Sequence, residues 1–137
     1  MSTLWLSRHA GTVISIEADL FWHEKLSSIL RSKNITNVDL RHEWQADSMS
    51  TFPGIRNNEL DLLVVDGGPR TQCLVNGFDK VKSGGYIYLD NWDFLNFWDD
   101  AEAFLISRCA EISSQQSFVD YVPGNFAVNQ GLLIRKH

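Results

Sequence analysis

The sequence has few cysteines, few prolines and no excess of positive charge. Its 137 residues include two cysteines, three prolines, 12 lysines and arginines, and 17 aspartates and glutamates, for a formal net charge of −5. Cys73 and Cys109 are too few for a disulfide framework and lack metal-ligand spacing, which favours a reduced, cytoplasmic setting. Without a basic cluster, the composition gives no support for a nucleic-acid backbone as the main partner.

Long apolar runs and several catalytic motifs are also missing. No run approaches the roughly 20 apolar residues of a membrane span, and residues 1–10 do not resemble a signal peptide. The chain contains no nucleophile elbow, phosphate-binding loop or paired-cysteine motif, and its four histidines show no metal spacing. These absences argue against a membrane partner and against hydrolase, kinase and zinc-enzyme functions.

Two apolar segments that end on acidic residues are the main positive signal. Leu60–Val65 runs into Asp66, and Tyr86–Leu89 runs into Asp90 and Asn91. Such segments are typical of buried parallel strands, and open α/β sheets bind ligands at the carboxyl ends of their strands. We therefore expect Asp66, Asp90 and Asn91 at one edge of the sheet, where a substrate or a cation would bind.

The hydrophobic pattern predicts alternating helices and strands. Helices are expected at residues 3–9, 20–33, 69–82 and 97–110, and strands at 12–17, 38–42, 60–65, 86–89, 117–122 and 131–135. Residues 43–59 are expected to form a loop with one helical turn. This order indicates a mainly parallel sheet, in which the last two strands, joined through Pro123-Gly124-Asn125, pair antiparallel at one edge.

Some positions within these elements receive specific expectations. Asp19 suits the N-cap of the helix at 20–33. The buried stripe of that helix is expected to contain Phe21, Leu26, Ile29 and Leu30, and the last helix is expected to bury Phe104, Leu105 and Ile106. A cluster of aromatic residues follows the strand at 86–89 and is either an acceptor-binding wall or part of the core or an interface: Trp92, Phe94, Phe97 and Trp98.

Three segments together resemble class I S-adenosylmethionine-dependent methyltransferases, most closely the small-molecule type related to catechol O-methyltransferase. Residues 13–19, 62–70 and 82–91 are similar to the second, fourth and fifth strands of that family, including the Gly-Gly before the fifth. The similarity covers nearly the whole chain and lies in the order and spacing of the segments. It implies a three-layer α/β fold with a Rossmann-like sheet, mainly parallel and ending in an antiparallel hairpin.

One family element has no counterpart in this sequence. The glycine-rich loop that follows the family's first strand and wraps the methionine end of the cofactor is absent, and residues 2–6 resemble the helix after that loop. The resemblance thus implies a single methyltransferase-like domain over residues 1–137 that lacks its first strand, as a truncated or a naturally short form. We expect the two strands that flank the missing one to pair directly, or a second copy of the chain to cover them in a homodimer.

The resemblance also assigns roles to individual residues. Glu17 would accept hydrogen bonds from the ribose hydroxyls of S-adenosylmethionine, and Trp44 would stack on its adenine ring. Asp66 would contact the cofactor and place the methyl acceptor, and it would share a Mg²⁺ ion with Asp90 and Asn91. Each residue has a purely structural alternative, as a helix cap, a packed side chain or a strand end.

The implied activity is methyl transfer from S-adenosylmethionine to a small-molecule acceptor, at oxygen. Arg70, one turn after Asp66, would pair with Asp66 or bind a substrate anion. The main alternative is a non-catalytic remnant that folds or dimerises without binding a cofactor. A nucleotide or sugar-nucleotide binder is a further alternative, which the lack of a glycine-rich phosphate loop disfavours.

Overall fold

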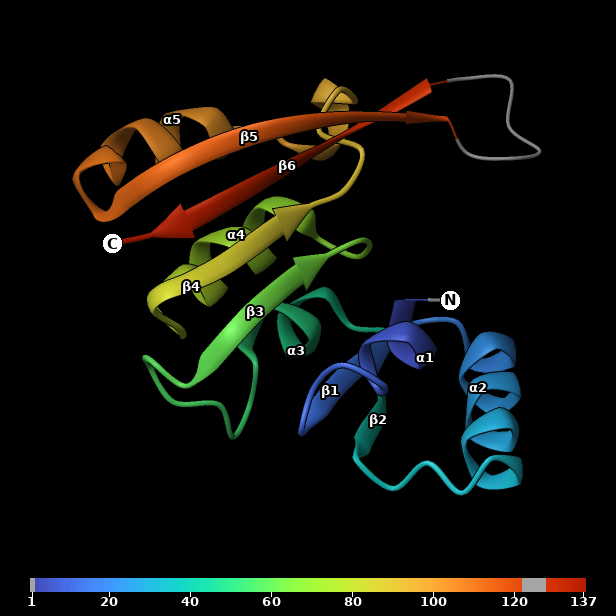
Figure 1. Cartoon of the computed structure of the whole chain (residues 1–137). Coiled ribbons are helices and arrows are strands. Elements are labelled where there is room, and N and C mark those ends of the chain that lie inside the picture. The colour runs from blue at the N-terminus through green and yellow to red at the C-terminus, as the bar shows by residue number, and fades with distance from the viewer. Residues whose placement is uncertain (1, 122–127) are drawn as a thin grey trace. The chain divides into compact units, whose positions relative to one another are not determined.

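The computed structural model describes residues 2–121 and 128–137, which form two compact units (Figure 1). The N-terminal unit contains Met1–Met49 and the C-terminal unit contains Ser50–His137. The expected turn at Pro123-Gly124-Asn125, and Val122 at the end of the strand before it, lie outside the described residues. No described helix is long and apolar enough to cross a membrane.

The N-terminal unit is a small parallel sheet with two helices. Its elements are α1 (Ser2–Leu6), β1 (Val13–Glu17), α2 (Leu20–Ser32) and β2 (Val38–His42), and α3 (Ala46–Thr51) begins at its end. β1 and β2 pair in parallel, with Glu17 opposite His42 at their carboxyl ends. The Asp19 side chain accepts a hydrogen bond of 2.8 Å from the backbone N–H of Trp22, so the expected N-cap of α2 is confirmed.

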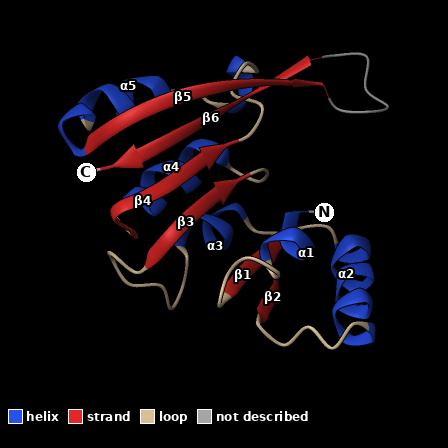
Figure 2. Cartoon of the chain, in the orientation of Figure 1, coloured by secondary structure: helices blue, strands red, loops and turns tan. Residues whose placement is uncertain are grey.

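The C-terminal unit is a mixed four-stranded sheet with its own helices (Figure 2). Its elements are β3 (Leu60–Val65), α4 (Arg70–Phe78), β4 (Val81–Leu89), the 3₁₀ turn η1 (Leu95–Phe97), α5 (Ala101–Ser107), the 3₁₀ turn η2 (Cys109–Glu111), β5 (Ile112–Tyr121) and β6 (Val128–Lys136). The strand order is β3-β4-β6-β5; β3 and β4 run parallel, and β6 runs antiparallel to both of its neighbours. The expected hairpin at one edge of the sheet is therefore confirmed.

The core of the C-terminal unit lies between the sheet and helices α4 and α5. Its largest fully buried side chains are Phe78, Leu74, Ile87, Leu89, Ile134 and Val81. Each such side chain stabilises the fold by roughly 1.5–3 kcal/mol relative to exposure in water. The ring of Phe78 meets that of Phe104 edge-on, with centroids 5.6 Å apart, and this contact joins α4 to α5.

The predicted ends of the two later helices are wrong. The helix expected over residues 69–82 ends at Phe78, and β4 already begins at Val81, because Val81 pairs with Leu60 of β3. The helix expected over 97–110 is confined to Ala101–Ser107, with a 3₁₀ turn on each side. β4 is extended by pairing with residues that are distant in the sequence. Such pairing cannot be predicted from local helix propensity.

Two side chains expected to be buried are exposed. Phe21 exposes 68% of its surface and Ile106 exposes 67%, whereas Leu30 and Leu105 are buried. Nine residues separate Phe21 from Leu30, and at about 100° per residue they lie on opposite sides of α2. Ile106 directly follows Leu105 and is rotated from it by about 100°, which turns it out of the core.

The two strands that flank the missing one, β1 and β3, lie in different units, so their expected direct pairing stays a prediction. Within the described residues, β1 pairs with β2 in the N-terminal unit, and β3 pairs with β4 in the C-terminal unit. In the N-terminal unit α2 packs on β1 and β2, and in the C-terminal unit α4 packs on β3 and β4. Residues 2–6 form a helix, as the resemblance implies.

Candidate active site

Two carboxyl groups meet at the carboxyl ends of β3 and β4. Val65 lies opposite Leu89 in the parallel register, and the N–H of Asp90 donates a 3.0 Å hydrogen bond to the carbonyl of Val65. The residues that follow, Asp66 and Asp90, are thereby adjacent, and their carboxyl groups are close enough to share a hydrogen bond when one of them is protonated. The sequence-based expectation that these strand ends lie at one edge of the sheet is confirmed in this geometry.

Asp66 holds its proton more tightly than an ordinary aspartate. Part of the residue is exposed to solvent, yet neighbouring protein atoms crowd its carboxyl group. This desolvation, together with the hydrogen bond to Asp90 and the negative charge of Asp90, raises the pKa of Asp66 to about 6, and the nearby Arg70 only partly offsets the rise. A carboxyl group with such a pKa can accept and release a proton near neutral pH.

Arg70 bridges the two strand ends through oxygen atoms that are not carboxylates. Its guanidinium donates to the backbone carbonyl of Asp66 at 3.1 Å, to that of Asp90, and to Oδ1 of Asn91 at 3.3 Å. Among the described residues Arg70 forms no ion pair with Asp66, and its guanidinium donates to the backbone carbonyl of Asp66 instead. Asn91 adopts a positive φ of 54°, a conformation that asparagine tolerates better than most residues.

The aromatic residues after β4 divide between the core and the surface. Trp98 is 5% exposed, and its indole N–H donates to the carbonyl of Asn91 at 3.1 Å. Phe97 and Phe94 are exposed and stack on each other with centroids 5.6 Å apart. The Arg70 guanidinium lies 5.0 Å from the centroid of Phe97, so the exposed rings extend the site beside Asp66 and Asp90.

The expected magnesium ligands do not fit a divalent ion in this arrangement. Asn91 Oδ1 is already an acceptor for Arg70, and Oδ1 of Asp90 lies 3.5 Å from the hydroxyl of Tyr88. At an effective dielectric constant of about 20, a guanidinium and a divalent cation about 5 Å apart would repel by roughly 7 kcal/mol. In the described part of the chain, no group of three or more His, Cys, Asp or Glu side chains is arranged to hold a metal ion.

Two of the residues expected to bind the cofactor, Glu17 and Trp44, lie in the N-terminal unit, whereas the third, Asp66, lies in the C-terminal unit. One carboxylate oxygen of Glu17, Oε1, accepts a 3.0 Å hydrogen bond from the backbone N–H of Asp19, which orients the side chain at the end of β1. Oε2 has no partner among the residues that the structure describes, and it is therefore available to a ligand donor. Trp44 follows β2 and exposes 71% of its surface, which leaves its ring face accessible for stacking.

The structure adds His42 to the residues at this strand end. His42 lies opposite Glu17 in the β1–β2 register, and its Nε2 is 3.2 Å from the carbonyl oxygen of Ala18. Its ring centroid is 5.4 Å from that of His23 on α2. The sequence offered a signal for this position, because the last residues of two adjacent parallel strands end at the same edge.

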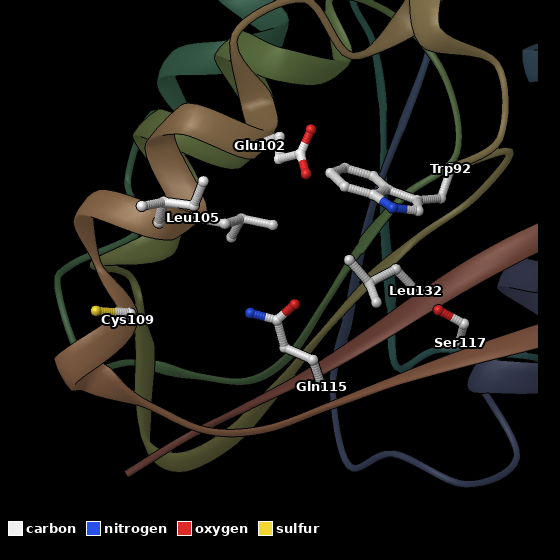
Figure 3. A pocket seen from close by; sticks show the side chains of 8 residues that line it. Trp92, Glu102, Leu105, Cys109, Gln115, Ser117 and Leu132 are labelled. Atoms are coloured by element: carbon white, nitrogen blue, oxygen red, sulfur yellow. The ribbon is translucent and has the colours of Figure 1, made fainter.

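A hollow of about 340 Å³ lies elsewhere in the C-terminal unit, between α5 and the β5–β6 hairpin. Figure 3 shows Glu102, Trp92 and Leu132 directed toward the same space. Its other lining residues are Leu105, Ile106, Cys109, Gln115 and Ser117. Neither Asp66, Arg70 nor Asp90 lines it, so the hollow is separate from the paired strand ends.

Several solved structures with a similar fold are methyltransferases. An O-methyltransferase from Bacillus cereus in complex with SAH matches with a TM-score of 0.74 and 17% identity, over 99% of this chain and 69% of that one. The O-methyltransferase TomG from Streptomyces achromogenes, in complex with SAM, matches with a TM-score of 0.74 and 17% identity, over 98% and 67%. An rRNA methylase from Streptococcus thermophilus matches with a TM-score of 0.69 and 14% identity, over 98% and 78%.

The chain has the class I S-adenosylmethionine-dependent methyltransferase fold, as its sequence implied. No protein-family model matches the sequence, and no curated protein matches it. The structural neighbours include both O-methyltransferases and an rRNA methylase, so the fold alone does not select the acceptor.

Proposed function

We propose that this protein binds S-adenosylmethionine and methylates an oxygen atom of a small-molecule acceptor. The observation that carries the proposal is the similarity of 98–99% of the chain to O-methyltransferases whose structures contain SAM or SAH. The acidic composition supports a small-molecule acceptor over a nucleic acid, because a net charge of −5 repels a phosphate backbone.

Each unit contributes its own part of the proposed chemistry. Bound S-adenosylmethionine supplies a sulfonium methyl group. The free Oε2 of Glu17 would accept hydrogen bonds from the ribose, and Trp44 would stack on the adenine. Asp66 would place the acceptor hydroxyl and take its proton as the methyl group is transferred, because its raised pKa suits a base near neutral pH. Positioning of the two reactants would supply most of the rate.

The proposed cofactor site is tested by calorimetry with S-adenosylhomocysteine on the whole chain. We expect saturable binding, weakened about tenfold or more in Glu17→Gln, because the amide removes one oxygen acceptor that faces the ribose hydroxyls. Glu24→Gln, which changes an exposed carboxylate on α2, is the matched control and should bind like the parent chain. No heat and no thermal shift at millimolar ligand would favour the non-catalytic alternative.

We also propose that the two units act as one methyltransferase-like domain and that two copies of the chain form a homodimer. The support is that β1 and β3 each pair on one side only within the described residues of their own unit, together with the exposed apolar side chains Ile14 on β1 and Leu62 on β3. A dimer should appear by light scattering at micromolar concentration. A mass of 15.6 kDa at all concentrations would identify a monomer instead.

A further inference from the structure

Arg70 lies at the point where the sequence suggested a metal ion. Its guanidinium contacts all three residues of the expected ligand set, through the carbonyls of Asp66 and Asp90 and the side-chain oxygen of Asn91. We propose that Arg70 is the resident cation of this strand-end site and that it excludes a divalent metal ion. The proposal concerns metal binding alone and does not depend on whether the protein transfers methyl groups.

The first argument is the use of the available oxygen atoms. A Mg²⁺ ion needs direct oxygen ligands at about 2.0–2.1 Å in near-octahedral geometry. Asn91 Oδ1 is 3.3 Å from Nη2 of Arg70 and accepts its hydrogen bond. Oδ1 of the Asp90 carboxylate lies 3.5 Å from the hydroxyl of Tyr88, which is its donor. A metal ion would therefore have to displace partners that the protein already supplies.

The second argument is that the Arg70 charge can neither be lost nor easily moved. An arginine side chain keeps its proton at any physiological pH, so it cannot become neutral when a metal ion approaches. The guanidinium carbon lies 5.0 Å from the ring centroid of Phe97 and 5.8 Å from that of Trp98. Trp98 is buried and bonded to the carbonyl of Asn91, which fixes one wall of the arginine site.

The third argument is the absence of a competing carboxylate partner. Arg70 makes no ion pair with an acidic side chain in the part of the chain that the structure describes, although Asp66 and Asp90 are close by. Its guanidinium instead donates hydrogen bonds to backbone and amide oxygens at the ends of β3 and β4. These are the oxygen types that a bound cation would use, so the guanidinium takes over the role of the metal.

Binding of Mn²⁺ to the whole chain, measured by electron paramagnetic resonance without cofactor, tests this proposal. We expect no binding to the parent chain up to 1 mM, a concentration of about the order that weak carboxylate sites require. Arg70→Met keeps an apolar side chain beside Phe97 and removes the charge, and it should bind Mn²⁺ at least tenfold more tightly. Addition of Asp66→Asn to Arg70→Met should abolish the gain.

Controls make each outcome decisive. Arg56→Met removes an exposed arginine of the same unit and should resemble the parent chain. If circular dichroism shows that Arg70→Met is unfolded, Arg70→Gln, which retains donors for the carbonyls, replaces it. Sub-millimolar binding to the parent chain that is lost in Asp66→Asn would overturn the proposal. Absence of binding in both the parent and the folded Arg70 variant would also overturn it, because the guanidinium would then not be what excludes the metal.

Discussion

At the scale of single residues, Gly131 packs so closely against Tyr88 that one added carbon atom should lower the stability of the fold. A Cβ atom on Gly131, in β6, would lie 2.7 Å from Cζ of Tyr88 in β4. We expect Gly131→Ala to lower the free energy of unfolding by about 1–3 kcal/mol, because the tyrosine ring must move within a packed sheet. Urea denaturation measures this difference.

The control for that substitution is Gly67→Ala. A Cβ at Gly67 meets no atom within 4 Å, and its φ is not in the left-handed region. Its free energy of unfolding should therefore stay within about 0.5 kcal/mol of that of the parent chain. Equal losses in both variants would contradict the steric explanation.

Asp66 should give the protein a defined dependence of stability on pH. Its pKa of about 6 lies above the ordinary value of 3.8, so between about pH 4 and 6 the folded state keeps a proton that the unfolded state has released. The stability that this group contributes is full below pH 4 and is lost as the pH rises through 6. Asp66→Asn should thus be more stable than the parent at pH 8 by about 1 kcal/mol, after allowance for solvent screening, but not at pH 4.

Urea denaturation of both chains at pH 4, 6 and 8 measures this difference. Asp99→Asn, which removes an exposed carboxylate from the same unit, is the control, and its difference from the parent should not follow the same curve. A gap between Asp66→Asn and the parent that is the same at all three pH values would contradict the prediction.

The candidate site was only partly predictable from sequence at this scale. Asp66 and Asp90 could be placed together because each ends an apolar strand, and the rule for strand ends does not require knowledge of side-chain contacts. The contacts of Arg70 could not be predicted, because two of its three acceptors are backbone carbonyls, which every residue has. The residue types in the sequence do not indicate which backbone carbonyl accepts a hydrogen bond from Arg70.

At the scale of elements, α2 depends on its N-cap. The Asp19 carboxylate satisfies the N–H of Trp22, one of the donors that a helix leaves unpaired at its start. We expect Asp19→Ala to destabilise the N-terminal unit by about 1 kcal/mol. In a thermal melt, its helical circular dichroism signal should be lost at a lower temperature than that of the parent chain. Asp19→Asn keeps an acceptor oxygen and should retain most of the stability, whereas similar losses in both variants would point to charge alone.

The elements that sequence predicted best are those with a strong local signal. β3 is an uninterrupted apolar run followed by Asp66, and its expected and observed bounds agree at Leu60–Val65. The first half of β5, Ile112–Gln116, has the sequence Ile-Ser-Ser-Gln-Gln and carries no apolar alternation. It becomes a strand because it pairs antiparallel with β6, as Gln115 does with Ile134. Such long-range pairing is not encoded in local periodicity.

At the scale of the whole molecule, the two units differ in how much apolar surface they bury. Val13 and Leu30 are the only buried apolar side chains of the N-terminal unit among the described residues, and the other buried apolar side chains belong to the C-terminal unit. The family fold was predictable from the order of segments, and this imbalance was not, because it depends on which strands pair. A small two-stranded sheet with so little core is of marginal stability.

Hydrogen exchange should therefore distinguish the two units. Amides of β1 and β2 should exchange through local opening with a lower opening free energy than amides of β4 and β6. The paired residues Ile87 of β4 and Ile134 of β6 are fully buried. Mass spectrometry of peptides from each strand measures this difference in the native state. Equal protection throughout would indicate one cooperative unit.

Hydrogen exchange in the presence of a bound ligand tests whether the two units act as one domain. S-adenosylhomocysteine that contacts Glu17 and Trp44 should slow exchange in β1 and in residues 43–45, since binding stabilises the folded state by an amount that grows with the logarithm of the ligand concentration relative to Kd. If the units act as one domain, the segment from Asp66 to Arg70 should gain protection as well. β5, at the far edge of the four-stranded sheet, is the internal control and should change least. Protection confined to the N-terminal unit would contradict the proposal that the two units act as one domain.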